Sequence, residues 1–532
     1  MRKMLLLFLC CAAAGLPGFG QEAGSAQARC ERLASLTLDG AKITSATLVA
    51  AASPIQGVTL SPALERATKA FCRVRITDRP SADSEVMTEV WLPAAGWNGR
   101  YRGQGNGGFA GNINYAAMAA DVVRGSATSG TDTGHGTEGA GFALGHPEKV
   151  KDFGWRAVHD MAVQSKMVIA AFYGKAAEHS YFTGCSDGGR EALMEAQRFP
   201  ADYDGILAGA PAYNWTGLLS AGTTIEKTLH TSASSYIPPS KLPAIGAAVR
   251  AACDANDRVR DGILNDPRDC RFDPASMACK AGDSDTCLLP DQVATLQTIY
   301  ATKKDAAGAK IFPGYLPGAE DVDGSWGGWV TGERAAMLYF GMGYFSNFVH
   351  GDKDWKLQSF DLDRDYKLAN ATTAQALNST DTDLRPFAAR KGRLILYHGW
   401  NDPGITALST VDYYNGLVTK MGHKAVESGV RLYMAPGMLH CDGGPGANNF
   451  GQSFHGGAPI RGDSRHDVVT ALEEWVESGR APGSLTATKF VDDDPAKTVS
   501  MTRPLCVYPQ RAKYVKGDTN DANSFVCRAA KP

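Results

Sequence analysis

Short apolar runs alternate with helical patterns on either side of a long irregular segment. Continuous apolar runs bounded by turn residues are typical of buried strands in a parallel sheet. Such runs occupy residues 181–183, 205–209, 394–397 and 430–434. Apolar residues at helical spacing predict helices over 152–172 and 467–478, and Gly479 ends the second. This alternation predicts an α/β fold with a mostly parallel sheet.

The irregular segment runs from about residue 213 to residue 380 and contains four cysteines and many aromatic residues. Because one strand-like run precedes it and another follows it, we predict an inserted lid domain over residues 213–380. The catalytic domain is then discontinuous and consists of residues 21–212 and 381–532.

Composition narrows the class of protein. The chain has 532 residues, of which 44% are hydrophobic and 21% charged, so it can bury a large core. Its 54 basic and 56 acidic residues nearly cancel, which argues against nucleic acid as a partner. Residues 1–20 have a basic start and a short apolar run, the pattern of a signal peptide. We therefore expect a secreted or periplasmic protein that does not span a membrane, and the sequence does not indicate its oligomeric state.

Ten of the twelve cysteines follow the predicted signal peptide, and an even number in an exported chain favours five disulfides over metal sites. No Cys-x-x-Cys pair is present to suggest zinc. Sequence does not fix the connectivity. Pairing of neighbours suggests Cys30–Cys72, Cys253–Cys270, Cys279–Cys287 and Cys506–Cys527, which leaves Cys185 and Cys441 for each other.

The strongest chemical signal is a G-x-S-x-G motif at residues 184–188, directly after a strand-like run and before a helical pattern. In this setting a sharp turn exposes the serine as a nucleophile, so we predict that Ser186 attacks a carbonyl group. The alternative is an ordinary glycine-rich turn with a capping serine.

A serine nucleophile needs a base and a carboxylate that orients the base. His440 follows a predicted strand, and Cys441 comes next, just as Cys185 precedes Ser186. If these cysteines are bridged, Ser186 and His440 lie within about 14 Å of each other. Asp402 follows the strand at 394–397, and the order Ser, Asp, His is that of α/β hydrolases. Other acids remain open, namely Asp132, Asp204 and Asp442, and we expect His398 to be a packed core histidine.

Together Cys185-Ser186, Asp402 and His440-Cys441 resemble the CS-D-HC motif of the tannase and feruloyl esterase family. The similarity extends over nearly the whole mature chain, including the segments at 97–100, 105–111, 127–135, 205–212 and 471–476. This resemblance implies an α/β-hydrolase core, a lid over the active site and a Cys185–Cys441 bridge that holds the catalytic residues together.

The motifs also indicate how the oxyanion would be stabilised. For the oxyanion we expect the backbone amide of Asp187 and one from the glycine-rich loop, at Gly108 or Gly107.

The resemblance also implies a structural Ca²⁺ in the lid, whereas the residues alone leave a solvated acidic loop equally open. Neither register of this loop fits an EF-hand. Its implied ligands are Asp254, Asp257 and Asp261, with the backbone carbonyls of Val259 and Ile263.

The resemblance implies a serine esterase that acts on a small aromatic ester without an organic cofactor. A feruloyl esterase is the best single hypothesis, with tannase or mono(2-hydroxyethyl) terephthalate hydrolase activity as alternatives. A free carboxylate on the substrate would require a guanidinium, for which Arg334 is a candidate. A peptidase and a non-catalytic secreted calcium-binding protein are the rival classes. Six lid aromatics could line the pocket or the lid core, namely Trp326, Trp329, Tyr339, Phe340, Tyr344 and Phe345.

Overall fold

The computed structural model describes residues 25–452 and 462–529. The predicted signal peptide at residues 1–20 lies outside the described residues. No helix in the described part of the chain is long and apolar enough to cross a bilayer.

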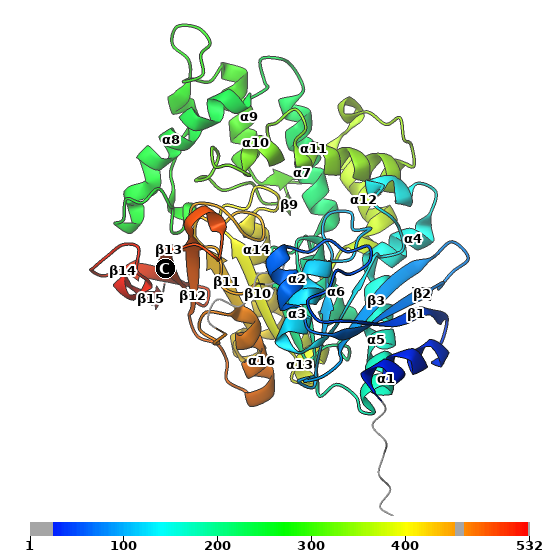
Figure 1. The fold of residues 1–532 in the computed structure, drawn as a ribbon. Helices are drawn as coiled ribbons and strands as arrows, with labels where there is room; N and C mark the ends of the chain where they lie inside the picture. The colour runs from blue at the N-terminus through cyan, green and yellow to red at the C-terminus, as the bar shows by residue number, and fades with distance from the viewer. Residues whose placement is uncertain (1–24, 453–461, 530–532) are drawn as a thin grey trace, which may run out of the picture.

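A nine-stranded sheet forms the centre of the molecule, in the order β1-β2-β3-β5-β4-β6-β7-β10-β11 (Figure 1). The strands from β5 to β11 in this order are parallel, whereas β1, β2 and β3 pair in antiparallel fashion. Their bounds are β1 Ala41–Val49, β2 Phe71–Asp78, β3 Val86–Pro93, β4 Arg100–Gln104, β5 Ala127–Thr131, β6 His179–Cys185, β7 Gly205–Gly209, β10 Arg393–Gly399 and β11 Val430–Ala435.

The four strands predicted from apolar runs are confirmed as β6, β7, β10 and β11, and they lie side by side. The prediction of a mostly parallel sheet is confirmed for this region. The three antiparallel strands near the N-terminus were not predicted. Their apolar residues are interspersed with polar and charged residues such as Arg73, Arg75 and Glu89, so they contain no long continuous apolar run.

Helices cover both faces of the sheet, and alternate residues of each strand supply the two cores. On one face Phe182, Ile206 and Leu396 pack against the layer that contains α5, α6 and α14. On the other face Tyr181 and Leu207 pack against α16. These helices are α5 Ala157–Tyr173, α6 Asp187–Arg198, α14 Ala407–Met421 and α16 Val468–Ser478.

Both helices predicted by spacing are present. A π-helical turn at Asp152–Arg156 leads into α5, and α16 starts after the capping side chain of Asp467. Gly479 ends α16 in the left-handed conformation, as a glycine at that position allows.

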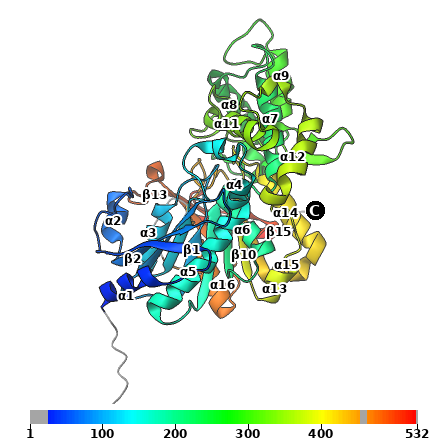
Figure 2. The same cartoon turned by 90° about the vertical axis from the view of Figure 1, so that its right-hand side faces the viewer.

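A helical layer built from residues after β7 lies above the sheet (Figures 1 and 2). It contains α7 Trp215–Leu229, α8 Leu242–Cys253, α9 Pro290–Tyr300, α10 Trp326–Trp329, α11 Ala336–Gly343 and α12 Leu362–Leu377, with the short strands β8 Lys303–Lys304 and β9 Lys310–Phe312. One of its apolar cores includes Phe142 and Phe153, which precede α5 in the chain. The ring of Phe142 makes a T-shaped contact with that of Phe348 in the layer, with centroids 5.3 Å apart.

The remaining elements flank the sheet or follow it. The helices are α1 Ala26–Arg32, α2 Pro62–Ala67, α3 Tyr115–Arg124, α4 Pro147–Lys151, α13 Arg385–Ala389 and α15 His423–Gly429. Two C-terminal hairpins pair β12 Leu485–Phe490 with β13 Val499–Leu505 and β14 Gln510–Tyr514 with β15 Phe525–Ala529.

Five disulfides join the described cysteines, in the same pairs that neighbour pairing suggested. They are Cys30–Cys72, Cys185–Cys441, Cys253–Cys270, Cys279–Cys287 and Cys506–Cys527.

Candidate active site

Ser186 lies at the sharp turn between β6 and α6, with φ 65° and ψ −123°. A positive φ is strained for a residue with a side chain, and this strain is typical of a nucleophile on a strand-to-helix turn. Two glycines allow the turn. A Cβ on Gly184 would lie 2.3 Å from the Gly188 carbonyl oxygen, and one on Gly188 would lie 2.7 Å from that of Asn106. The Ser186 hydroxyl makes no capping hydrogen bond to α6, so the alternative of a capping serine does not hold.

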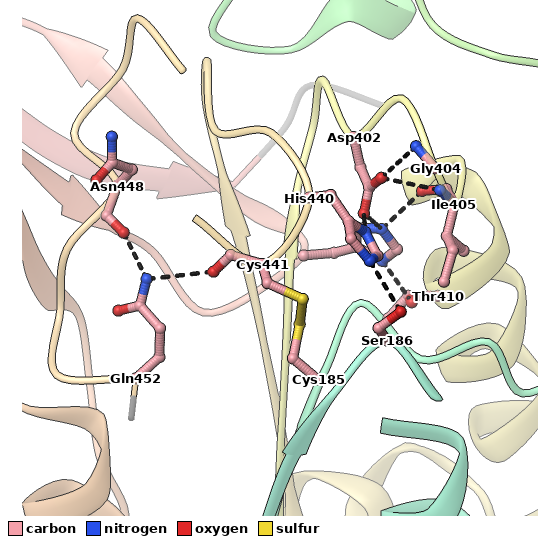
Figure 3. The surroundings of a disulfide bond; sticks show 11 residues. Cys185, Ser186, Asp402, Gly404, Ile405, Thr410, His440, Cys441, Asn448 and Gln452 are labelled. Atoms are coloured by element: carbon pink, nitrogen blue, oxygen red, sulfur yellow. Dashed lines mark hydrogen bonds and ion pairs between the residues drawn. A yellow bond between two sulfur atoms is a disulfide. The ribbon is translucent and has the colours of Figure 1, made fainter. Parts of the chain in front are cut away.

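Ser186, His440 and Asp402 form one hydrogen-bonded chain (Figure 3). Asp402 Oδ2 lies 2.8 Å from His440 Nδ1. Because a carboxylate only accepts hydrogen bonds, Nδ1 carries the proton and Nε2 is an acceptor. The Ser186 Oγ lies 2.8 Å from Nε2 and donates to it. The structure thus brings the three predicted residues together beyond the carboxyl ends of β6, β10 and β11.

The Asp402 carboxylate is buried and accepts hydrogen bonds on both oxygens. Oδ1 accepts the backbone amides of Gly404 and Ile405, each at 2.8 Å. Burial alone would raise the pKa of Asp402, but the charge and hydrogen bond of His440 and the hydrogen bond of His398 outweigh it. They hold the pKa of Asp402 well below its usual range, so the group is a carboxylate at neutral pH.

His398 is fully buried, as expected for a packed core histidine. Its Nε2 lies 3.0 Å from Asp402 Oδ2 and 2.8 Å from the Ile405 carbonyl oxygen, so Nε2 donates to both. Nδ1 lies 2.7 Å from Thr410 Oγ1. His398 therefore helps to hold the Asp402 carboxylate in place.

Two of the other acids considered from the sequence bind backbone amides instead. Asp132 accepts from the amides of Met87 and Gly134 at 2.9 and 2.8 Å. Asp204 accepts from the Ser180 amide at 2.9 Å. Neither supplies the acceptor for His440 Nδ1, which is Asp402.

The Cys185–Cys441 disulfide lies directly beside the reactive groups (Figure 3). It joins two residues 256 positions apart, with their Cα atoms 6.0 Å from each other. One cysteine precedes Ser186 and the other follows His440, so the bridge ties the turn after β6 to the loop after β11.

The glycine-rich loop packs against the start of α6. The Gly188 amide donates to the Asn106 carbonyl at 3.0 Å. Gly108, in the left-handed conformation, lines the same pocket as Ser186 and Asp187, whereas Gly107 does not line it. Of the two glycines considered for the oxyanion, Gly108 is therefore the one that lines the pocket at Ser186.

An apolar pocket opens at Ser186 and His440 between the sheet and the helical layer. Its walls come from α7, α10, α11 and the loop after β10, and include Trp215, Leu218, Leu219, Trp329, Met337, Phe340 and Ile405. Among the six lid aromatics singled out from the sequence, Trp329 and Phe340 line it, Trp326, Tyr344 and Phe345 are buried in the helical layer, and Tyr339 is exposed. The α7 residues of this wall were missed, because a buried helix gives no sign of which side faces a ligand.

Each of the three aspartates in the acidic loop after α8 already has a hydrogen-bond or ion-pair partner. Asp254 accepts the Gly262 amide, and Asp257 accepts the Val259 amide. Asp261 pairs with Arg503 at 2.5 Å and also accepts the Ile263 amide. Burial, followed by the charges of Asp261 and Asp254, raises the pKa of Asp257 to about 6. In the described part of the chain the trio whose ligand atoms all lie within 4.8 Å of one another is elsewhere, at His159, Glu195 and Asp202.

Parallel strands that present a strained serine, a histidine and a buried aspartate at their carboxyl ends, in this chain order, are the arrangement of an α/β hydrolase. The family model "Tannase and feruloyl esterase" matches residues 72–528. An esterase of Xanthomonas campestris is 38% identical, with 94% of this chain and 92% of the relative covered. A protein of Aspergillus flavus named "Probable feruloyl esterase B-2" is 35% identical, with 82% of this chain and 83% of the relative covered.

Solved structures of two proteins have the same fold as this chain. Feruloyl esterase B from Aspergillus oryzae superposes with a TM-score of 0.87 at 30% identity, covering 95% of this chain and 100% of that one. Tannin acyl hydrolase from Aspergillus niger, at 22% identity and a TM-score of 0.73, shares the fold, with 95% of each chain covered. The chain belongs to the tannase and feruloyl esterase family and is a carboxylic ester hydrolase. The peptidase and non-catalytic alternatives do not hold.

Proposed function

We propose that this protein is a secreted serine esterase that hydrolyses esters of aromatic carboxylic acids, with feruloyl esters as the preferred class. The proposal depends above all on one observation: hydrogen bonds link Ser186 to His440 and His440 to Asp402, and Ser186 and His440 line a pocket with aromatic walls. Relatives named as feruloyl esterases support the choice of acid.

In this mechanism Ser186 Oγ attacks the ester carbonyl while His440 Nε2 takes its proton. The same proton then passes to the leaving alcohol, and water repeats the steps to release the acid. Asp402 stabilises the imidazolium that forms in each step. The amides of Asp187 and Gly108 are our candidates for stabilising the oxyanion.

The pocket walls favour a neutral aromatic acid over the terephthalate monoester. Trp215, Trp329 and Phe340 offer aromatic surface, and no lysine or arginine of the described chain lines the pocket. Arg334, the guanidinium considered from the sequence, is exposed and is not among the lining residues. A free carboxylate would lose its water there without gaining a cation, which costs binding energy.

Turnover on a panel of esters tests this proposal. Purified mature protein is assayed on methyl ferulate, methyl gallate, mono(2-hydroxyethyl) terephthalate and p-nitrophenyl acetate. We expect methyl ferulate to exceed the terephthalate monoester by about tenfold or more in kcat/KM, the size of one unpaired buried polar group. The Ser186→Ala variant should lose turnover on every ester, whereas Ser409→Ala, at a buried serine on α14, should retain it.

Wild-type turnover in Ser186→Ala would refute the triad. A preference for the terephthalate monoester or for methyl gallate would leave the esterase standing and overturn the choice of acid.

We also propose that Asp254, Asp257 and Asp261, with the carbonyls of Val259 and Ile263, hold a structural Ca²⁺. The three carboxylates belong to one loop, and Asp254 and Asp261 add to the burial that raises the pKa of Asp257, a repulsion that a divalent cation would offset. Their ligand atoms do not all lie within 4.8 Å of one another in this structure, so the ion would have to draw them together. Arg503 competes for Asp261, so the ion would have to displace or share this contact. Chelator dialysis followed by thermal unfolding tests the site. We expect added Ca²⁺ to raise the melting temperature of the wild type but not of Asp257→Asn, and an equal shift in both would refute it.

We also propose that the protein is exported to the periplasm or the cell exterior. Five disulfides in one chain fit an oxidising compartment such as the periplasm or the exterior. Cell fractionation with an activity assay checks it, and activity confined to the cytosol would contradict it.

A further inference from the structure

A buried pair of carboxyl groups lies under the turn that carries Ser186. Asp187 and Glu191 are one helical turn apart on α6, and each is about 1% exposed. Asp187 Oδ1 pairs with Arg190 Nε at 2.6 Å. Among the described residues, Asp187 Oδ2 and Glu191 Oε1 have no hydrogen-bond donor.

The charges around this pair do not balance if both groups are ionised. Arg190 is the cation in contact, and its remaining nitrogens donate to the carbonyls of Gly154 and Phe153. One guanidinium offsets one carboxylate, so a second buried negative charge would have no partner. A single proton on Glu191 removes this charge and supplies a donor from Glu191 to Asp187.

The other oxygen of Glu191 reaches the glycine-rich loop. Glu191 Oε2 accepts the backbone amide of Asn106 at 2.9 Å. The carbonyl of the same Asn106 accepts the Gly188 amide at 3.0 Å. The packing is tight, because a Cβ on Gly105 would lie 2.8 Å from both Glu191 Oε2 and the Gly188 Cα.

Glu191 thus touches both segments that we assign to the oxyanion hole. Asp187 supplies one candidate amide, and the loop that leads from Asn106 to Gly108 supplies the other. We infer that Glu191, as a neutral carboxylic acid, is a positioning residue that joins these two segments by donating to Asp187 and accepting from Asn106. The inference rests on the proposed function, since it concerns the same site.

The ionisation of Glu191 follows from its surroundings. Burial, and next the charge of Asp187, raise the pKa of Glu191 to about 8. The titratable groups that face it are Asp187 and Arg190, with Glu195 one turn further along α6. The loop at residues 105–108 that packs against it contributes no titratable side chain. Above pH 8 Glu191 loses the proton that it donates, so the hydrogen bond to Asp187 is lost.

Two substitutions distinguish the hydrogen bonds of Glu191 to Asp187 and Asn106 from a simple packing role of its side chain. Glu191→Gln keeps both contacts, because its amide can donate to Asp187 and its oxygen can accept from Asn106. Glu191→Ala removes both. Glu195→Ala is the matched control, because Glu195 is equally buried on the same helix and does not touch the loop of Asn106.

The test measures kcat and KM on p-nitrophenyl acetate from pH 6 to pH 9.5, with far-UV circular dichroism for each variant. For Glu191→Ala we expect kcat to fall about 10- to 100-fold with KM within about twofold, since misplaced oxyanion donors weaken only the transition state. Glu191→Gln should keep kcat within about twofold of wild type at pH 7 and lack the alkaline decline that the wild type shows. Glu195→Ala should keep both kcat and the alkaline decline.

Unchanged kcat in Glu191→Ala would overturn the inference, and so would an equal loss in Glu191→Gln and Glu191→Ala. An alkaline decline that persists in Glu191→Gln would overturn it as well. If Glu191→Ala fails to fold, the comparison of Glu191→Gln with wild type across pH still decides. Failure of the proposed function looks different, because the wild type would then hydrolyse no ester or Ser186→Ala would remain active.

Discussion

Removal of the Cys185–Cys441 disulfide should lower both the free energy of unfolding and the turnover. The length of the closed loop decides the size of the first effect, and the position of the bridge beside Ser186 and His440 decides the second. The bridge closes a loop of 256 residues, for which the chain-entropy model gives about 5.5 kcal/mol of stabilisation at 25 °C. The Cys279–Cys287 bridge closes a loop of 8 residues, for which the same model gives about 2.5 kcal/mol. For a chain of 532 residues these losses correspond to melting temperatures lower by roughly 5 and 2 °C.

The two double alanine variants therefore form a matched pair. Cys185→Ala/Cys441→Ala should also lose activity in the folded state, because the bridge adjoins both Ser186 and His440, whose Oγ and Nε2 are 2.8 Å apart. A displacement near 1 Å can cost about 100-fold in rate. Cys279→Ala/Cys287→Ala should keep wild-type kcat, since that bridge lies in the helical layer away from the pocket.

Differential scanning calorimetry and steady-state kinetics at 25 °C measure both effects. Equal destabilisation by the two variants would refute the loop-length argument. Wild-type kcat in folded Cys185→Ala/Cys441→Ala would refute the coupling of the bridge to the catalytic geometry.

Three further predictions concern Asp402 and the turn before Ser186. Asp402→Asn should lower kcat by about 10³- to 10⁴-fold with little change in KM, because the amide no longer stabilises the His440 imidazolium; a loss below tenfold would contradict this. The pKa of Asp402 is depressed in the folded state, so its contribution to stability is present above its ordinary value and is lost as pH falls through the lower folded value. Urea unfolding should accordingly show the stability advantage of wild type over Asp402→Asn narrowing below about pH 4, and an advantage that grows on acidification would exclude this. Gly184→Ala should yield inactive or unfolded protein, because its Cβ would lie 2.3 Å from the Gly188 carbonyl oxygen, and a variant that is both stable and active would show that the turn can shift.

The part of the sheet that could be predicted was the part with continuous apolar runs. Strands β6, β7, β10 and β11 each contain a continuous apolar run because both faces of the sheet are covered there. Strand β2 carries Arg73 and Arg75, which pair with Glu89 of β3, and such cross-strand ion pairs interrupt the apolar pattern from which strands are predicted. The N-terminal part of the sheet was therefore missed.

The same contrast holds for the site. Ser186, Asp402 and His440 each follow a predictable strand, so chain order and turn residues were enough to place them together. Contacts between segments far apart in the sequence could not be predicted, because no local sequence pattern indicates them. The amide of Asn106 on Glu191 and the wall formed by Trp215 depend on how distant segments pack, which neither spacing nor composition encodes.

The packing of Phe142 and Phe153 within the helical layer has a consequence for engineering substrate choice by exchange of whole lids between relatives. A cassette cut at residues 213 and 380 would carry the aromatic residues around Phe348 into a host whose own segment before α5 was shaped for a different partner. Each mismatched ring would open a void or a clash in a shared core. The exchangeable unit of this molecule is thus larger than the insertion, because residues 139–153 and Phe109, whose ring stacks on Phe348, share its core and would have to be transplanted with it.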